Sequence, residues 1–241
     1  MRAVLAAVAA FVLCAANAAA GTHLTVYAAS SLTDVFPKID ASQRYAFGGS
    51  NMLAAQIQQG APADVFAAAN TSLPDQLHAK GLCTKPVVFT RNALVVVVPR
   101  ANRAGIDSVS DLTKPGIKVV VAATGVPVGD YTLEALKRLH VAAAVQKNVV
   151  SRETDVREVL AKVALGEADA GFVYATDART VARKVKTIKL PARAQPNVKY
   201  GICVVTSSSR RAYAQAFIRR VLSKAGQAKL LAAGFLPRVN R

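Results

Sequence analysis

The stretch VYAASSLTDVF, residues 26–36, decides the fold that we expect for this chain. A β-rich run ends there in the small residues AASS, and a helical pattern follows. A strand that leads through small residues into a helix presents backbone N–H groups to an anion. A second such turn, GGSN at residues 48–51, precedes an amphipathic helical run. The two turns therefore aim two helix N-termini, each with a serine, at a ligand.

The rest of the chain alternates short apolar runs with segments of helical periodicity. We expect strands at residues 24–27, 65–68, 93–98 and 117–122. We expect helices at residues 32–39, 52–59, 73–79, 131–140, 155–165 and 213–232. This alternation predicts an α/β fold with mostly parallel sheets. Ligands of such folds bind beyond the C-terminal ends of the strands, which is where the two serine turns stand.

The N-terminus has the pattern of a cleaved signal peptide, residues 1–20. Arg2 precedes an uncharged run, and alanines at positions 16, 18 and 20 suit signal peptidase. An uncleaved anchor is the weaker alternative, because the strongly apolar part is short for a bilayer. Cys14 follows Val12 and Leu13, whereas lipoprotein cleavage needs a small residue immediately before the cysteine. We therefore predict a soluble protein exported to the periplasm.

Charge and cysteine content leave two questions open. The net charge is +17, but Lys and Arg are scattered and Trp is absent, which disfavours a nucleic-acid partner. The charge either attracts small anions over long range or keeps the protein soluble. Cys83 and Cys203 are free to pair in an oxidising compartment, although their spacing says nothing about geometry.

Nothing in the sequence supports catalysis. The three histidines are His23, beside the expected mature N-terminus, and His78 and His140, in solvated helical stretches. None of them is placed as a general base. The motifs Gly-x-Ser-x-Gly, Cys-x-x-Cys and His-Glu-x-x-His do not occur. We therefore expect a protein that is not an enzyme.

Several blocks together resemble the periplasmic molybdate-binding proteins of the bacterial extracellular solute-binding protein family, which feed ATP-driven importers. The matching blocks are AASSLTDVF, FGGSNMLAAQIQQGAPADVFAAAN, RNALVVVVP, VPVGDYTLEAL, ETDVREVLAKVALGEADAGFVYATDA and the closing AAGF. The segments GAPADVF and GEADAGFVYATDA, in this order, are the most specific. The resemblance covers nearly all of the chain after the signal peptide.

The resemblance implies a set of oxyanion ligands at five positions. Ser31 and Ser50 would bind through their hydroxyl and N–H groups, Val128 and Val156 through their N–H groups, and Tyr174 through its hydroxyl. The ligand would be molybdate or tungstate, with the metal present only as the oxyanion and with no cofactor. Such a set supplies only donors, so it disfavours anions that carry a proton. Sulfate is a less expected ligand.

The resemblance also implies a two-lobed type II clamshell of mostly parallel sheets with two crossing hinge strands, near residues 94–98 and 200–204. Lobe 1 would hold residues 21–98 and 200–241, and lobe 2 residues 99–199. A monomer would capture the anion, close and deliver it to an inner-membrane ABC permease with its ATPase. An anion-sensing receptor domain on the same fold is the alternative from another class.

Two departures from the family pattern bear on the site. The segment between Leu32 and Ser50 is shorter than usual, which affects where Ser50 is placed. Asp130 follows the VPVG turn, where the family often has an apolar or basic residue. Pointing outward it would favour the helix N-terminus, whereas pointing inward it would repel a dianion and accept the proton of phosphate.

Overall fold

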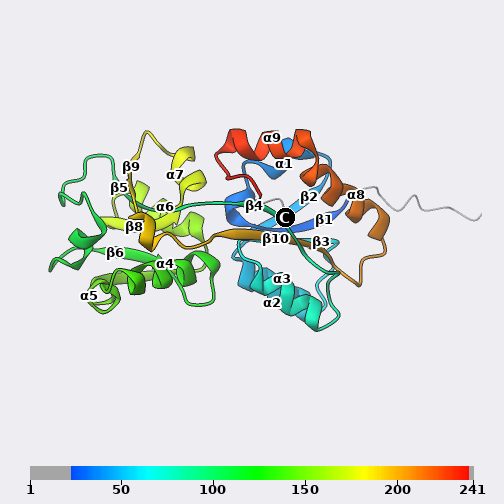
Figure 1. Ribbon diagram of the computed structural model, residues 1–241, viewed down its shortest axis with the longest axis horizontal. Coiled ribbons are helices and arrows are strands. Elements are labelled where there is room, and N and C mark those ends of the chain that lie inside the picture. The colour runs from blue at the N-terminus through cyan, green and yellow to red at the C-terminus, as the bar shows by residue number, and fades with distance from the viewer. Residues whose placement is uncertain (1–22, 239–241) are drawn as a thin grey trace, which may run out of the picture.

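The computed structural model describes residues 23–238, which form two α/β lobes side by side (Figure 1). Lobe 1 is built on a sheet with the strand order β2-β1-β3-β10-β4, and lobe 2 on a sheet with the order β7-β6-β8-β5-β9. The predicted α/β clamshell is confirmed. The predicted signal peptide lies outside the described residues. Within residues 23–238, no helix has the length and apolar character needed to cross a membrane.

Lobe 1 places its helices on both faces of its sheet (Figure 1). Its strands are β1 (Thr25–Ala29), β2 (Arg44–Gly48), β3 (Val65–Ala68), β4 (Val87–Arg91) and β10 (Lys199–Val204). Its helices are the 3₁₀ turn η1 (Ser30–Leu32), α1 (Phe36–Ile39), α2 (Ser50–Gln58), α3 (Ser72–Ala79), α8 (Arg211–Leu222) and α9 (Lys224–Ala233). Helices α2 and α3 cover one face of the sheet, and α1, α8 and α9 cover the other.

Lobe 2 repeats this layered arrangement. Its strands are β5 (Leu94–Pro99), β6 (Val119–Ala122), β7 (Val149–Glu153), β8 (Ala170–Tyr174) and β9 (Val185–Lys189). Its helices are η2 (Val109–Thr113), α4 (Pro127–Arg138), α5 (Ala142–Lys147), α6 (Val156–Ala164), α7 (Ala175–Thr180) and η3 (Ala192–Ala194). The inner strands are apolar along their whole length because helices cover both faces of the sheet.

Each sheet contains one strand that runs against the other four. Strand β10 is antiparallel to β3 and β4, and β5 is antiparallel to β8 and β9. Each of these two strands follows directly after the chain has crossed from the other lobe. The predicted predominance of parallel strands therefore holds for four strands in each sheet, and the two reversed strands are those that follow the crossings.

The lobe boundary differs from the prediction at one strand. We expected residues 94–98 in lobe 1, but β5 pairs with β8 and β9 in lobe 2. The first crossover is therefore the short link Asn92–Ala93 between β4 and β5, and the second is residues 190–198 between β9 and β10. The two crossovers are joined by a hydrogen bond from the Asn92 N–H to the Val198 carbonyl, 3.1 Å long. The connecting segments, and not strands β5 and β10, join the two lobes.

Two helix predictions also change. The expected helix at residues 32–39 is the turn η1 followed by the single-turn α1, which contains Pro37. The expected helix at residues 213–232 is broken between α8 and α9, because Ser223 is extended with φ −65° and ψ 161°. Its hydroxyl accepts a hydrogen bond from the Gly226 N–H at 3.1 Å and begins α9 as an N-cap.

Cys83 and Cys203 form a disulfide, with their Cα atoms 5.9 Å apart. This answers the question that their spacing in the sequence left open. Both cysteines belong to lobe 1, where they lie in a buried cluster with Leu53, Phe66 and Leu77. The bond joins the segment before β4 to β10, so it links the strand that enters from the second crossover to the rest of its lobe.

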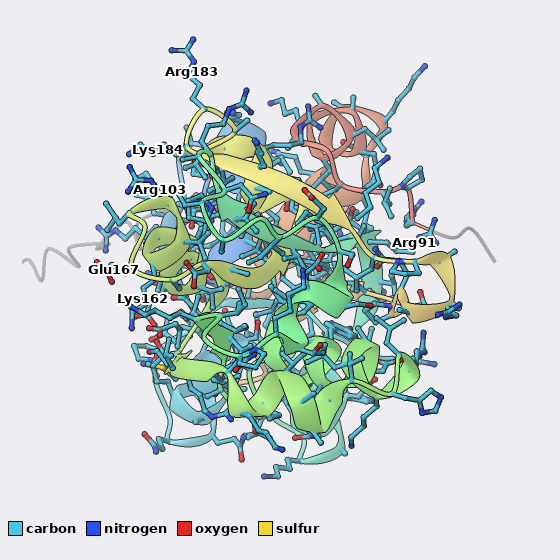
Figure 2. The ribbon with its side chains drawn as sticks, turned by 90° about the vertical axis from the view of Figure 1, so that its left-hand side faces the viewer. Arg91, Arg103, Lys162, Glu167, Arg183 and Lys184 are labelled. Carbon is cyan, nitrogen blue, oxygen red and sulfur yellow. A yellow bond between two sulfur atoms is a disulfide. The ribbon has the colours of Figure 1, made fainter. Side chains whose placement is uncertain are left out.

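The many basic side chains lie on the surface. Figure 2 shows Arg103, Arg183 and Lys184 pointing outward from lobe 2, with Arg91 on the opposite side of this view. Arg91 also contributes to the structure of lobe 1, because its Nε donates a 2.8 Å hydrogen bond to the Pro237 carbonyl. The charges are spread around the molecule, which agrees with the absence of a dense basic run in the sequence.

Candidate anion-binding site

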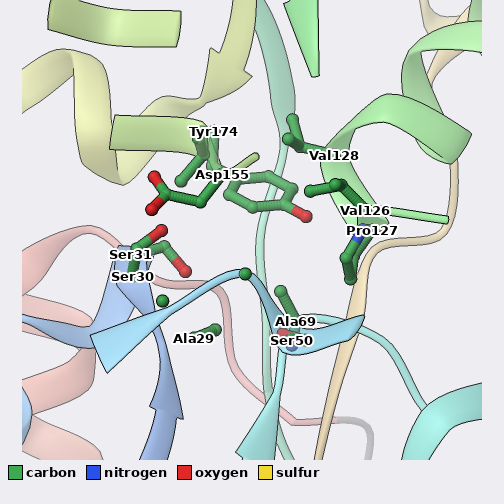
Figure 3. Close-up of a pocket in the computed structure, with 13 residues that line it drawn as sticks. Ala29, Ser30, Ser31, Ser50, Ala69, Val126, Pro127, Val128, Asp155 and Tyr174 are labelled. Carbon is green, nitrogen blue, oxygen red and sulfur yellow. The ribbon is translucent and has the colours of Figure 1, made fainter. Parts of the chain in front are cut away.

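All five residues that the family resemblance implies as ligands line one small cavity between the lobes (Figure 3). They are Ser31, Ser50, Val128, Val156 and Tyr174, and each is 3% exposed or less. The other lining residues are Ala29, Ser30, Gly48, Gly49, Ala69, Val126, Pro127 and Asp155. The cavity volume is about 10 Å³. A space of this size is too small for sugars and peptides.

Lobe 1 contributes two serine hydroxyls from the turns that follow β1 and β2. Strand β2 pairs in parallel with β1, with Gly48 opposite Ala29, so the two turns come side by side despite the short segment before Ser50. The Ser50 Oγ accepts a hydrogen bond from the Ala69 N–H at 3.1 Å. The Ser31 Oγ lies 2.8 Å from the Tyr200 hydroxyl. Each hydroxyl is therefore held by a partner from its own lobe.

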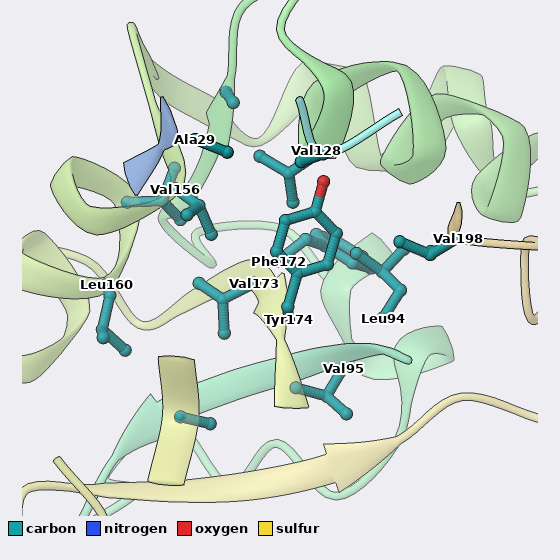
Figure 4. Close-up of a cluster of buried hydrophobic side chains, with 14 of the residues drawn as sticks. Ala29, Leu94, Val95, Val128, Val156, Leu160, Phe172, Val173, Tyr174 and Val198 are labelled. Atoms are coloured by element: carbon teal, nitrogen blue, oxygen red, sulfur yellow. The ribbon is translucent and has the colours of Figure 1, made fainter. Parts of the chain in front are cut away.

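Lobe 2 contributes the N-termini of two helices. Val128 is the second residue of α4, and Val156 is the first residue of α6. N–H groups in the first turn of a helix have no intrahelical acceptor. These positions also carry the partial positive charge of the helix dipole. The valine side chains pack into the lobe 2 core, with Phe172 among their neighbours (Figure 4).

Tyr174, the last residue of β8, supplies the most distinctive group. Its hydroxyl is buried and has no hydrogen-bond partner within residues 23–238. Burial holds the pKa of Tyr174 well above its ordinary value, so the hydroxyl stays protonated and remains a donor. A buried polar group without a partner costs about 1–3 kcal/mol, so this hydroxyl is expected to meet a ligand.

Two carboxylates near the site, those of Asp130 and Asp155, differ in whether they line the cavity. Asp130 points outward: it is exposed, it does not line the cavity, and its Oδ1 accepts a 2.9 Å hydrogen bond from the Gly125 N–H. Asp155 does line the cavity, so the expectation of a site made only of donors is corrected. It caps α6 by accepting hydrogen bonds from the N–H groups of Arg157 and Glu158. Figure 3 shows its carboxylate turned away from the Tyr174 hydroxyl.

Sequence reasoning missed Ser30 and Asp155 as lining residues. The only local signals were the second serine of the AASS turn and the position of Asp155 directly before a helical pattern. Nowhere in residues 23–238 do three His, Cys, Asp or Glu side chains gather so as to hold a metal ion. The donor set of the cavity suits an anion instead.

The two lobes contact each other beside the cavity. A Cβ atom added to Gly49 would lie 2.4 Å from the carbonyl oxygen of Thr154 in lobe 2, so only glycine permits this approach. Arg157 of α6 forms an ion pair across the cleft with Asp34 of lobe 1. Its Nε also donates to the fully buried Asp177 at 2.6 Å. The two lobes are therefore in direct contact on this side of the cavity.

Burial raises the pKa of Asp177 to about 7, although Arg157 opposes the shift. One carboxylate oxygen, Oδ2, has no hydrogen-bond partner in the described part of the chain. Asp177 and Asp34 both bind the guanidinium of Arg157. Asp177 belongs to the same lobe as Arg157, so it holds this side chain in the position from which it reaches Asp34.

A clamshell of two α/β lobes, closed over a small cavity lined by serine hydroxyls, helix N-termini and a tyrosine hydroxyl, defines a binding protein for a small anion. This chain belongs to the family described as bacterial extracellular solute-binding protein, whose family model matches residues 24–236. The membership agrees with export from the cell.

Known proteins of this kind are similar over nearly the whole chain. The molybdate-binding protein ModA of Mycobacterium tuberculosis (strain H37Rv) is 37% identical, over 95% of this chain and 93% of its own length. The periplasmic molybdate-binding protein of Azotobacter vinelandii has the same fold, with a TM-score of 0.79, 21% identity, and coverage of 90% of this chain and 100% of its own. The sulfate-binding protein SubI of M. tuberculosis H37Rv gives a TM-score of 0.78 at 20% identity, with coverage of 90% and 87%. Fold similarity alone therefore does not separate the two anions.

Proposed function

We propose that this protein is the periplasmic substrate-binding component of an ABC-type importer and that its ligand is molybdate, with tungstate as a chemically equivalent second ligand. The observation that carries the proposal is the buried Tyr174 hydroxyl, which has no hydrogen-bond partner within residues 23–238 and lines one cavity together with Ser31, Ser50 and two helix N-termini. A tetrahedral dianion offers acceptors to all of these donors at once. The ModA relatives support molybdate as the dianion.

The energetics are sufficient without a lysine or arginine in the cavity. About five to seven charge-assisted hydrogen bonds, at about 1.5–3 kcal/mol each, outweigh the several kcal/mol lost in freedom on binding. The surplus corresponds to micromolar to nanomolar affinity. The helix N-termini of α4 and α6 add partial positive charge where the oxyanion would lie.

Delivery completes the proposed mechanism. The mature monomer, freed of residues 1–20, would bind the anion in an open state, close about the two crossovers and present the closed form to the permease, whose ATPase drives import. No covalent step and no resident cofactor are required. The contacts of Gly49 and Arg157 across the cleft support such closure, because they bring the two lobes together beside the cavity.

The proposal is tested by isothermal titration calorimetry of the mature, anion-stripped protein with molybdate, tungstate, sulfate and phosphate at one pH and ionic strength. Micromolar or tighter binding of molybdate and tungstate, with much weaker binding of the other two, is the expected result. Tight binding of sulfate or phosphate alone would overturn the assignment of the ligand. Binding of none of the four would overturn the assignment of the cavity.

Hydrogenphosphate is a second candidate because Asp155 lines the cavity. A carboxylate is able to accept a hydrogen bond from the O–H of this anion, whereas it can only repel a dianion that carries no proton, such as molybdate. The variant Asp155→Asn separates the two ligands, since asparagine is also a good N-cap for α6. Molybdate affinity should rise or stay unchanged in this variant, while phosphate affinity would fall if phosphate were the natural ligand.

A further inference from the structure

A chain of hydrogen bonds runs from the first crossover to the Ser31 hydroxyl. It begins at Asn92, whose side chain is buried. The Ala93 N–H donates to Asn92 Oδ1 at 2.9 Å, which identifies this atom as the oxygen of the amide. The amide nitrogen Nδ2 therefore faces the other way, toward the Thr176 Oγ1 at 2.8 Å and the Tyr200 hydroxyl at 3.4 Å.

This orientation settles the direction of the next bond. The Asn92 amide nitrogen can only donate, so the Tyr200 oxygen accepts from it. The Tyr200 hydroxyl is fully buried, and burial keeps its pKa well above the ordinary value, so it retains its hydrogen. The remaining close partner of that hydroxyl is the Ser31 Oγ at 2.8 Å. The hydrogen bonds of this chain are all satisfied when Tyr200 donates its hydrogen to Ser31 and Ser31 accepts it.

The consequence for the cavity follows from counting hydrogens. A serine hydroxyl has one hydrogen, and the Ser31 oxygen already accepts from Tyr200. Its own hydrogen is left for the cavity that Ser31 lines. Ser50 is in the same condition, because its oxygen accepts from the Ala69 N–H. The group that orients the Ser50 hydroxyl is a backbone N–H, that of Ala69. The group that orients the Ser31 hydroxyl is the Tyr200 side chain, which a substitution is able to remove.

We propose that Tyr200, oriented by Asn92, is a specificity-determining positioning residue that fixes Ser31 as a hydrogen-bond donor and so favours fully deprotonated oxyanions over anions that carry a proton. The inference deepens the proposed function and rests on it. An anion such as hydrogenphosphate must place its O–H against an acceptor, whereas the Ser31 hydroxyl, held by the bond from Tyr200, turns its hydrogen toward the anion. The Asp155 carboxylate is an acceptor on the cavity wall whose orientation does not depend on Tyr200 or Asn92.

The variant Tyr200→Phe tests the proposal because it keeps the ring that packs against Tyr174, Phe89 and Phe235. Without the tyrosine hydroxyl, Ser31 is able to rotate and accept. Calorimetry should show molybdate affinity lower by about three- to tenfold, and the ratio of molybdate to phosphate affinity lower by about tenfold or more. Asn92→Ala should shift the same ratio in the same direction by a smaller factor. A loss of affinity that leaves the ratio unchanged would overturn the proposal.

The matched control is Tyr45→Phe, which also removes a tyrosine hydroxyl from lobe 1. The Tyr45 hydroxyl donates to the Asp40 carbonyl at 2.6 Å and does not reach the cavity. This variant should lose stability but keep the wild-type ratio of affinities. A shift of the ratio as large as that of Tyr200→Phe would show that any weakening of lobe 1 changes selectivity, and it would overturn the role of Tyr200.

A neutron structure of the deuterated protein tests the direction of the bond itself, whichever anion is bound. Deuterium on the line from the Tyr200 oxygen to Ser31 Oγ supports the proposal, and deuterium on any other line overturns it. The proposed ligand and the proposed role of Tyr200 can therefore be overturned independently of each other. If the wild type prefers sulfate, the proposed function is wrong, while the sulfate-to-phosphate ratio in Tyr200→Phe still tests the role of Tyr200.

Discussion

The strands of the two lobes are arranged in an equivalent order, but the lobes place different kinds of hydrogen-bonding group at the cavity between them. In each sheet the fourth strand in the order is the reversed one, and it follows a crossover from the other lobe. Lobe 1 offers side-chain hydroxyls, from Ser31 and Ser50, that are already held by partners in that lobe. Lobe 2 offers backbone N–H groups at two helix N-termini and the Tyr174 hydroxyl, which has no hydrogen-bond partner in the described part of the chain.

This difference predicts which of the two lobes loses affinity for the anion when one side chain is substituted. A hydroxyl donor is lost with one substitution, whereas a backbone donor survives any side chain that keeps the helix. The Val128 and Val156 side chains face the core, so their identity matters for packing and not for the anion. Mutations should therefore act on affinity where the donor is a side chain, and on stability where the donor is an N–H group.

The largest effect should come from the point where the lobes touch. Gly49→Ala places a Cβ atom 2.4 Å from the Thr154 carbonyl oxygen and should block closure, which lowers molybdate affinity by about 10- to 100-fold in calorimetry. Gly49 has φ −60°, so alanine causes no backbone strain. Gly48→Ala is the control, because its Cβ would meet only the Leu53 side chain at 3.9 Å. Equal affinities of the two variants would refute the closure argument.

The next largest effect on affinity should come from removing one hydroxyl of either lobe, and the stability of the variant should differ between the two lobes. Tyr174→Phe should weaken molybdate binding by about tenfold or more, since a charge-assisted hydrogen bond contributes about 1.5–3 kcal/mol. Its unliganded form should be as stable as the wild type or more stable, because the hydroxyl has no partner in the described chain. Ser50→Ala should also weaken binding but lower the melting temperature, because it leaves the Ala69 N–H without its acceptor. Identical stability changes in both variants would contradict this contrast.

Asp177 should give lobe 2 a dependence on pH. Burial raises its pKa to about 7, so the folded state holds the proton more tightly than the unfolded state. Protonation therefore stabilises the fold, and this contribution is lost as pH rises from about 4 to about 7. In urea titrations, the free energy of unfolding of the wild type, relative to Asp177→Asn, should fall over this range. A constant difference would show that Asp177 is ionised throughout.

A smaller effect is expected from the ion pair that joins the lobes. Asp34→Asn removes the partner of Arg157 across the cleft and should raise the dissociation rate of molybdate by about two- to fivefold, as for an exposed pair. High salt should remove the difference, because it screens exposed charges. Glu134→Gln is the control, since its partner Arg138 lies on the same helix of lobe 2. A stopped-flow measurement in which Glu134→Gln speeds dissociation equally would rule out a cross-lobe effect.

The smallest change in affinity should come from the backbone donors. Val128→Ala and Val156→Ala keep the N–H groups at the starts of α4 and α6, so molybdate affinity should stay within about twofold of the wild type. Each truncation leaves a cavity in the core and should lower the free energy of unfolding by about 1–3 kcal/mol. A large loss of affinity, measured by calorimetry on folded protein, would mean that the side chains themselves shape the site.

Much of the fold was predictable because its signals are local. The apolar run at residues 65–68 coincides with β3, and the predicted helix at residues 73–79 differs from α3 by one residue. The long helix predicted at residues 213–232 failed because the backbone turns at Ser223, and its capping by a side-chain hydroxyl does not interrupt the helical periodicity. The five ligand positions came from the family resemblance, and their gathering in one cavity came from the structure.

The sequence alone was enough to predict the α/β class, elements such as β3 and α3, the small-residue turns at the ends of β1 and β2, and the family, because periodicity and motifs are properties of neighbouring residues. Only the tertiary structure decided that β5 belongs to lobe 2, that Gly49 meets Thr154, and that Tyr200 reaches Ser31 across 169 positions. These contacts depend on which strands pair and how closely two lobes pack. That packing determines which groups form a hydrogen bond, and a local sequence pattern does not predict it.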